Sequence, residues 1–357
     1  MNIQAAPQAG PPARQLYYPS YLQVRLARLR RLPSPVSGST TDQQEDSSTL
    51  SMIRIGTRGS KLALWQAQWV AQELRQLGYD VELQVIATKG DVSTQPLSQV
   101  GGQGLFTKEI QRELLANRVD VAVHSLKDLP TVPVDGLRLA AVPQRETTAD
   151  VLISRSGAGF LALPPGATIG TGSSRRVAQL RHWRSDINVI DIRGNVDSRL
   201  AKVDRGDYDA IILAAAGLTR LGLKERITEI LPVEHMLPAI GQGALGLECR
   251  NDDASTCDAL VRLNHPPSFA EVSAERALLA KLLAGCLAPV AARGTASGER
   301  VELVGRVLSL DGRRVLAASD SGNADHAVAI GERLAQKLLD QGAAELIAAS
   351  RAASLSA

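Results

Sequence analysis

Residues 167–176 read Ala-Thr-Ile-Gly-Thr-Gly-Ser-Ser-Arg-Arg, and this short stretch decides the fold class. A strand-like run gives way to small residues, and a helical pattern then covers residues 174–184. The same succession occurs near the start, where a strand is predicted over 53–57 and a helix over 60–77. Short β-branched runs that alternate with helical patterns predict an α/β protein with a largely parallel sheet.

The remaining segments extend this pattern and then change character. Further strands are predicted at 81–87, 119–124, 187–192, 210–213 and 244–249, and further helices at 106–117 and 196–204. Near the C-terminus, helical patterns precede strand-like runs, and one last amphipathic helix is expected; these segments are 254–263, 269–283, 301–308, 313–318 and 327–346. We therefore expect two similar α/β units followed by a smaller α+β unit.

The composition excludes several classes of protein. The 357 residues include 40 Lys+Arg and 37 Asp+Glu, so a net charge of +3 argues against a polybasic nucleic-acid binder. Only 3% of residues are aromatic, which disfavours base-stacking platforms. Three cysteines are too few for a disulfide framework and favour a reducing compartment. No apolar run approaches the length of a membrane span.

Residues 1–51 differ from the rest of the chain. They contain five Arg and three acidic residues, and residues 37–48 within them form a polar linker. The Arg-rich stretch at 25–31 is compatible with an organelle transit peptide, but Pro is frequent there and Ser is not enriched. We expect a disordered extension without chemistry, and Met52 is a candidate for a second translation start.

Positively charged residues follow four of the predicted strands. In open α/β sheets, ligands bind beyond the carboxyl ends of the strands, so these residues mark a candidate site. They are Arg58, Lys127, the pair Arg175 and Arg176, and Arg193, with Arg199 further along the helix that follows.

The pair Arg175 and Arg176 is the most informative of these. Arginines in the first turn of a helix oppose the helix dipole, so their role is expected outside the helix, with a negatively charged ligand. The alternative is a solvated basic turn. Because Arg binds carboxylates and phosphates in a bidentate manner, the four strand ends together predict a polyanionic ligand between the two α/β units.

Asp128, next to Lys127, is the candidate acid–base residue. A carboxylate among cations can stabilise positive charge that develops in a reaction. The structural alternative is an Asx turn before Leu129 and Pro130.

Other motifs carry less information. Gly241–Gly246 matches GxGxxG but leads into a predicted strand rather than a helix, so we reject dinucleotide binding. The five His are scattered, and Cys249 and Cys257 lack zinc-ligand spacing, so no metal site is expected. Cys286 lies in a Gly/Pro turn, where covalent chemistry and a spectator role are both possible; Cys249 and Cys257 are expected to be buried spectators.

Taken together, these segments resemble the porphobilinogen deaminase family (hydroxymethylbilane synthases) from about residue 53 to 350. The resemblance rests on stretches in family order, which are 55–58 (IGTR), 62–67 (LALWQA), 88–91 (TKGD), 104–109 (GLFTKE), 123–130 (VHSLKDLP), 193–196 (RGNV), 208–218 (YDAIILAAAGL), 238–244 (PAIGQGA) and 285–286 (GC).

The resemblance implies three domains after the extension. The first two are doubly wound α/β domains of the periplasmic-binding-protein type (type II), and the third is α+β with a small antiparallel sheet and attaches the cofactor. The boundaries implied are 52–145 with 243–262 for domain 1, 146–242 for domain 2 and 263–357 for domain 3.

The resemblance also implies the chemistry. Cys286 carries a dipyrromethane cofactor through a thioether, four porphobilinogens are added head to tail with loss of ammonia, and water releases hydroxymethylbilane. Asp128 assists ammonia loss and stabilises the cationic azafulvene and pyrrole intermediates. Cofactor and substrate side chains are bound by Arg58, Ser60, Lys127, Ser173, Arg175, Arg176, Arg193 and Arg199, and Phe106 also contacts substrate.

Two positions depart from the family pattern. Gln103 stands where the family often has Lys, which weakens a contact from a flap to a carboxylate, and Ala284 replaces the first Gly of the usual Gly-Gly-Cys. The competing classes are a solute-binding protein, which has no use for Cys286, and an inactive relative. We expect a cytoplasmic monomer without nucleic-acid or membrane partners, or a plastid or mitochondrial enzyme if residues 1–51 are a transit peptide.

Overall fold

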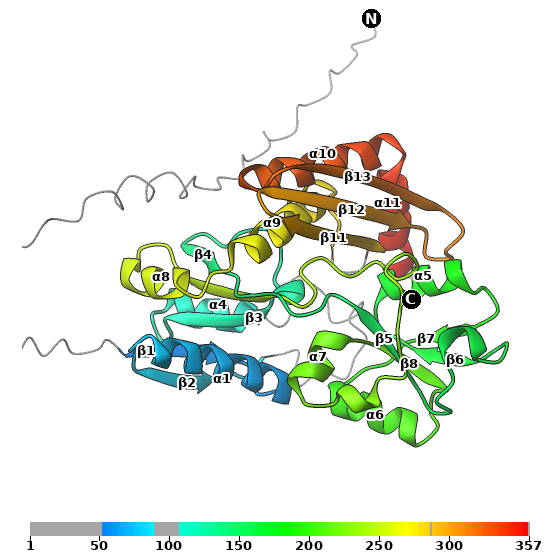
Figure 1. Ribbon diagram of the computed structural model, residues 1–357, viewed down its shortest axis with the longest axis horizontal. Coiled ribbons are helices and arrows are strands. Elements are labelled where there is room, and N and C mark those ends of the chain that lie inside the picture. Colours follow the sequence, from blue (N-terminus) through cyan, green and yellow to red (C-terminus); the bar gives the residue numbers. More distant parts are fainter. Residues whose placement is uncertain (1–51, 89–106, 286–287, 356–357) are drawn as a thin grey trace, which may run out of the picture. The chain divides into compact units, whose positions relative to one another are not determined.

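Three β-sheets organise the computed structural model, which describes residues 52–88, 107–285 and 288–355 (Figure 1). The first sheet has the strand order β2-β1-β3-β10-β4. Its strands are β1 (Ile53–Thr57), β2 (Val81–Val85), β3 (Val121–Ser125), β4 (Leu137–Ala141) and β10 (Leu245–Arg250).

Helices cover both faces of the first sheet. Helix α1 (Lys61–Gln76) begins at Ser60, whose hydroxyl accepts a hydrogen bond from the Ala63 amide. Its residues Ala67, Val70, Ala71 and Leu74 follow the helical period and pack on the sheet together with α8 (Ala254–Val261). Helix α4 (Lys108–Leu115) buries Ile110 and Leu114 on the opposite face.

The second sheet repeats the topology of the first, with the order β7-β6-β8-β5-β9. Side chains of successive residues point to opposite faces of a strand: Leu152 packs with Leu180 of α5, and Ile153 packs with Leu200 of α6. The elements are β5 (Asp150–Ser154), β6 (Thr168–Gly170), α5 (Ser174–Trp183), β7 (Asn188–Ile190), α6 (Val196–Asp204), β8 (Ala210–Ala214), α7 (Ala215–Arg220) and β9 (Glu229–Ile230).

The predicted α/β class is confirmed, but the sheets are mixed rather than largely parallel. In each sheet the fourth strand runs antiparallel to both of its neighbours. These strands are β5, which follows the passage of the chain from the first sheet to the second, and β10, which follows its return. The chain therefore reaches each of these two strands directly from the other sheet. A crossover helix, which would make the strand parallel to its neighbours, does not precede either of them.

The third sheet is antiparallel and has the order β11-β12-β13. Its elements are α9 (Pro266–Lys281), β11 (Val290–Ser297), β12 (Arg300–Leu308), β13 (Val315–Asn323), α10 (Ala327–Asp340) and α11 (Ala343–Leu355). Helices α9 and α10 share a core with it (Figure 1). The prediction of one helix over 327–346 is wrong, because Gly342, at φ +98°, separates α10 from α11. No helix in the described ranges is long and apolar enough to cross a membrane.

Two chain segments, residues 142–149 and 237–244, connect the first and second sheets. They lie against each other, because a Cβ added to Gly243 would approach the Glu146 carbonyl oxygen to 2.4 Å. Gly243 also has φ +84°, in the left-handed region that favours glycine. The glycines of the GxGxxG match therefore serve this close approach of the two connections. The match leads into strand β10 and not into a helix, which agrees with the rejection of dinucleotide binding.

The buried carboxylate of Glu275 in α9 joins these connections to the third sheet. It accepts hydrogen bonds from the guanidinium of Arg145 (2.8 and 3.0 Å) and from the amides of Gly241 (2.7 Å) and Gly294 (2.8 Å). Arg145 belongs to the outgoing connection, Gly241 to the returning one and Gly294 to β11. Burial alone would lower the pKa of Arg145, but Glu275 and Glu271 outweigh it and raise that pKa.

A hairpin of the third sheet contacts α5. His182 hydrogen-bonds through Nδ1 to the carbonyl of Gly312 (2.9 Å), and Arg181 donates to the carbonyl of Leu310 (3.0 Å). A Cβ on Gly312 would lie 2.6 Å from the His182 nitrogen, so only glycine permits this approach. The hairpin thus holds the C-terminal half of the helix that begins with Ser174 and Arg175.

We expect Glu275→Gln to lower the free energy of unfolding by about 3–5 kcal/mol, because it leaves the Arg145 guanidinium buried without its main counter-ion. The matched control is Glu271→Gln, which removes a longer contact to Arg145 (3.4 Å) from a more exposed side chain, and about 1 kcal/mol is expected there. Urea unfolding of both variants measures the difference. Equal losses of unfolding free energy in the two variants would mean that Glu275 is not the main counter-ion of Arg145.

Candidate active site

The loop at the carboxyl end of β3 carries Lys127 and Asp128, in the single turn η2 (Leu126–Asp128). Just before it, Ser125 exchanges hydrogen bonds with Gln66 of α1 (2.9 and 3.1 Å). Just after it, Arg276 of α9 donates to the carbonyls of residues 129 and 130 (2.9 and 2.7 Å). Side chains from two helices therefore fix the loop on both sides of Asp128.

Gly241 lies directly beside this turn. A Cβ at this position would be 3.2 Å from the Lys127 amide nitrogen, and Gly241 has φ +71°. The returning connection therefore passes against the backbone of the candidate acid–base pair. Any side chain at position 241 would therefore displace either the returning connection or the turn that carries Lys127 and Asp128.

A second group of charges surrounds Asp150, at the start of β5. Its carboxylate is fully buried and accepts hydrogen bonds from Arg175 (2.7 Å), Arg176 (2.7 and 3.0 Å) and Gln242 (3.0 Å). Burial would raise the pKa of Asp150, but the two arginines outweigh it and lower that pKa. One carboxylate faces two guanidinium groups, so one positive charge is left over.

Arg175 and Arg176 point out of their helix, as predicted, but toward Asp150 and the backbone. Arg175 also donates to the carbonyl of Leu237 (2.7 Å), and Arg176 to that of Ile212 (2.9 Å). Their cost at a helix N-terminus is therefore offset by a buried counter-ion. The Nε of Arg175 is buried without a hydrogen-bond partner, so a donor remains for a further acceptor.

A third group lies after β7. Arg193 pairs with Asp191 (2.9 Å), and Arg199 of α6 donates to the carbonyl of Gly194 (2.7 Å). Gly194 has φ +113°, and its missing Cβ leaves room for the Ser198 hydroxyl. Burial, and repulsion from Arg176 and Arg193, lower the pKa of Arg199 to about 10, against the attraction of Asp191 and Asp128.

These three groups form one electrostatic cluster. The side chain of Lys127 is solvent-exposed, yet its pKa is lowered to about 8. The main cause is the loss of water to the protein around it, and Arg176 and Arg175 add repulsion. The carboxylates of Asp128 and Asp150 act in the opposite direction and raise the pKa. Five cations face three carboxylates, which leaves an excess of two positive charges. The cluster consists of Lys127, Asp128, Asp150, Arg175, Arg176, Asp191, Arg193 and Arg199.

The other predicted site residues either follow strands β1 and β6 or lie outside the described residues. Arg58 is half-buried after β1, and Ser60 uses its hydroxyl to cap α1. Ser173 is the N-cap residue of α5, but its hydroxyl makes no capping hydrogen bond. Cys286 and Phe106 lie outside the described residues, as does Gln103, whereas Ala284 is buried.

Asp150 and Gln242 are site residues that were not predicted from the sequence. The available signal was an acidic residue directly before the apolar run 151–153, where a buried charge requires a partner. A third unpredicted residue is Arg220 of α7, which donates to the Gly243 carbonyl (2.7 Å) and lies 6.0 Å from the Trp65 ring of α1. Burial lowers the pKa of Arg220 to about 10.

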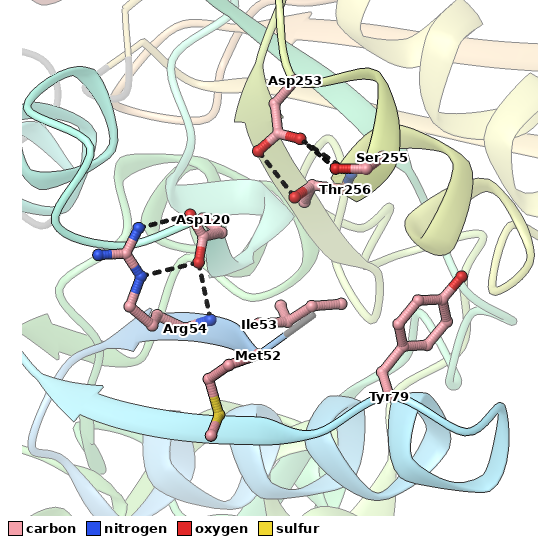
Figure 2. Close-up of a pocket in the computed structure, with 8 residues that line it drawn as sticks. All are labelled: Met52, Ile53, Arg54, Tyr79, Asp120, Asp253, Ser255 and Thr256. Atoms are coloured by element: carbon pink, nitrogen blue, oxygen red, sulfur yellow. Dashed lines mark hydrogen bonds and ion pairs between the residues drawn. The ribbon is translucent and has the colours of Figure 1, made fainter. Parts of the chain in front are cut away.

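A pocket of about 280 Å³ lies at the opposite end of β1, and Figure 2 shows that both of its carboxylates, those of Asp120 and Asp253, are already hydrogen-bonded. Asp120 accepts from Arg54 (2.8 and 2.9 Å) and from Arg250 (2.9 Å), which lower its pKa to about 2 although burial would raise it. Asp253 accepts from the Thr256 amide and hydroxyl (3.0 and 2.8 Å). These carboxylates therefore hold the fold together at this end.

Among the described residues, no group of three or more His, Cys, Asp or Glu side chains is arranged to hold a metal ion. The expectation of a metal-free site remains an expectation.

Two repeated α/β sheets with a cationic cluster around one fixed carboxylate define the class: an α/β protein built to act on an anionic ligand. The family model described as "Porphobilinogen deaminase, dipyromethane cofactor binding domain" matches residues 53–258, and "Porphobilinogen deaminase, C-terminal domain" matches 269–340. The chain belongs to the porphobilinogen deaminase family, and its activity is that of the family, porphobilinogen deamination in tetrapyrrole biosynthesis.

Curated relatives agree with this assignment. The porphobilinogen deaminase of Pelobacter propionicus is 49% identical over 293 residues, which cover 81% of this chain and 94% of the relative. That of Geobacter metallireducens is 50% identical over 299 residues, covering 83% and 94%. A periplasmic sulfonate-binding protein from Methylobacillus flagellatus is similar at a TM-score of 0.36 and 15% identity, covering 64% of this chain and 67% of that one, a likeness too low to support an argument.

We expect the KM for porphobilinogen to rise as the pH passes upward through about 8, because Lys127 is charged below that value and neutral above it. If its charge binds a substrate carboxylate, the loss approaches about tenfold per pH unit. Lys127→Arg should flatten the profile, since Arg stays charged. Lys337→Arg, in α10, is the control and should retain the rise; an unchanged profile in Lys127→Arg would remove Lys127 from substrate binding.

Proposed function

We propose that this chain joins porphobilinogens head to tail, four for each product, with loss of one ammonia at each addition and final release of hydroxymethylbilane by water. When bound, a dipyrromethane attached to Cys286 supplies the terminal pyrrole carbon that attacks the incoming substrate. The observation that carries the proposal is the cationic cluster that includes Asp128 and is fixed by the buried carboxylate of Asp150, in a chain that belongs to the family.

The residues of the cluster fit this cofactor. Each pyrrole carries two carboxylates, and the cluster has an excess of two positive charges and a buried, unpartnered donor at Arg175 Nε. Arginine and lysine are the side chains that bind carboxylates most strongly. We assign cofactor and substrate carboxylates to Arg58, Ser60, Lys127, Ser173, Arg175, Arg176, Arg193 and Arg199, and a further substrate contact to Phe106.

Asp128 is assigned to the chemical step. Loss of ammonia leaves positive charge on the substrate pyrrole, and a carboxylate held in place stabilises that charge without reorganising during the reaction. The contacts of Ser125 and Arg276 on either side of η2 supply this rigidity.

The main alternative is a binding protein that holds an anion without reaction. The third sheet argues against it, since α9 both holds the Asp128 loop through Arg276 and leads toward Cys286. We further propose the three domains with boundaries 52–145 with 243–262, 146–242 and 263–357, and a monomer in the cytoplasm, in keeping with the bacterial relatives.

We expect the intact purified protein to be heavier than its sequence by one dipyrromethane, and Cys286→Ala to lack this increment. The matched control, Cys257→Ala, should retain it. Intact-protein mass spectrometry measures all three. An active wild-type protein of unmodified mass would exclude the covalent cofactor.

We expect Asp128→Asn to retain the cofactor mass but to lower kcat by about 10²–10⁴-fold, as for loss of a positioned catalytic carboxylate. Asp135→Asn, in the exposed turn that follows, should keep normal turnover. Steady-state rates and intact masses together separate failure of chemistry from failure of cofactor attachment. Turnover near the wild-type rate would exclude Asp128 from the reaction.

A further inference from the structure

Asp191 belongs to the cationic cluster but has no part in the chemistry described above. It follows β7, and its Oδ2 accepts a hydrogen bond from Arg193 Nε at 2.9 Å. Within the described ranges, no other carboxylate is recorded in an ion pair with Arg193. The side chain of Asp191 is 49% exposed, whereas that of Asp150, the counter-ion of Arg175 and Arg176, is fully buried. A ligand can therefore reach Asp191, but it cannot reach Asp150.

The carboxylate of Asp191 lies beside the start of α5. Its Oδ1 is next to Gly172, since a Cβ built on that glycine would be 2.9 Å from this oxygen and 3.9 Å from Arg193 Cζ. Gly172 directly precedes Ser173, the N-cap residue of α5, whose hydroxyl makes no capping hydrogen bond. A helix N-terminus and a guanidinium group both favour an anion. Asp191 therefore holds its carboxylate in a position that also suits the carboxylate of a ligand.

The backbone on both sides of this ion pair is fixed, while the ion pair itself is easily exchanged. Tyr208 donates from its hydroxyl to the Asp191 carbonyl (2.8 Å), and Lys202 donates to the Arg193 carbonyl (3.1 Å). The two side chains are joined by the one hydrogen bond recorded between them, and both are partly exposed. Such pairs contribute little to stability, so a ligand carboxylate can replace Asp191 at Arg193 at little cost.

We propose that Asp191 competes with bound carboxylates for Arg193 and so limits how tightly this enzyme holds its substrate and product. A ligand carboxylate that displaces Asp191 leaves it unpaired, and one that binds the Nη nitrogens of Arg193 meets the negative charge of Asp191 nearby.

This competition matters most for the product. Each addition of a pyrrole brings two further carboxylates, so the attraction between the cluster and the bound chain grows as the chain lengthens. An internal carboxylate that takes back Arg193 weakens this attraction and helps the finished product to leave. The inference rests on the proposed function, because the growing chain supplies the competing carboxylates.

The test compares Asp191→Asn with the wild-type holoenzyme. Asn keeps the shape and a hydrogen-bond acceptor but removes the charge, so the excess of positive charges in the cluster rises from two to three. We expect the KM for porphobilinogen to fall about two- to fivefold, the size expected for one partly exposed ion pair, with kcat unchanged or lower. Inhibition by citrate, an unreactive tricarboxylate, should strengthen by a similar factor.

The matched control is Asp186→Asn. Asp186 also pairs with an arginine two residues away, Arg184 (3.0 Å), but it lies before β7, at the opposite end of that strand from the cluster. Its KM and its inhibition by citrate should stay at the wild-type values. Asp191 is half-exposed, so its substitution is compatible with folding, and the intact mass with bound dipyrromethane checks that each variant is folded and loaded.

The direction of the change in KM decides the outcome. A KM that rises in Asp191→Asn would overturn the proposal, since Asp191 would then position Arg193 for binding rather than compete for it. Equal KM and equal citrate inhibition in Asp191→Asn and the wild type would overturn it as well. A wild-type protein that neither carries the cofactor nor releases ammonia from porphobilinogen would instead refute the proposed function.

Discussion

One buried carboxylate, that of Glu275, connects the parts of this molecule that must act together. It is bound by Arg145 and Gly241, one on each connection between the first two sheets, and by Gly294 of the third sheet. A buried charge is tolerated only when its hydrogen-bonding capacity is met, so the three segments must meet at this point. The side chain of the next residue, Arg276, links the same helix to the loop of Asp128 through a hydrogen bond to the carbonyl of Leu129.

The candidate site depends on how unequal charges are balanced. Asp150 neutralises one of the two arginines at the start of α5, and Asp191 pairs with Arg193. The fold can therefore bring five cations together in the absence of a ligand, while enough positive charge remains to bind a polycarboxylate. Without Asp150, two buried guanidinium groups would face each other unpaired, at a cost of several kcal/mol.

Local signals in the sequence were sufficient for much of this. The strand 53–57 and the helix 196–204 are found at the predicted residues, and the cations at the strand ends lead to most of the cluster. Strand β11 was missed because Ala291, Ala292 and Gly294 have little β-propensity; small residues are required there, since a Cβ on Gly294 would meet the Glu271 backbone at 2.8 Å. Asp150 was missed because its partners come from distant segments, and spacing along the chain does not reveal them.

The exchanged fourth strands have a consequence for how the chain is made. Strand β3 pairs with β10, so Ser125 cannot pair with Leu245 until that residue has been synthesised, 120 residues later. Until then β1, β2 and β3 form a half-sheet whose edge offers unpaired backbone groups to other chains. Every strand of the second sheet precedes β10 in the chain, so the N-terminal sheet, although begun earlier, can be completed only after Arg250 has been synthesised.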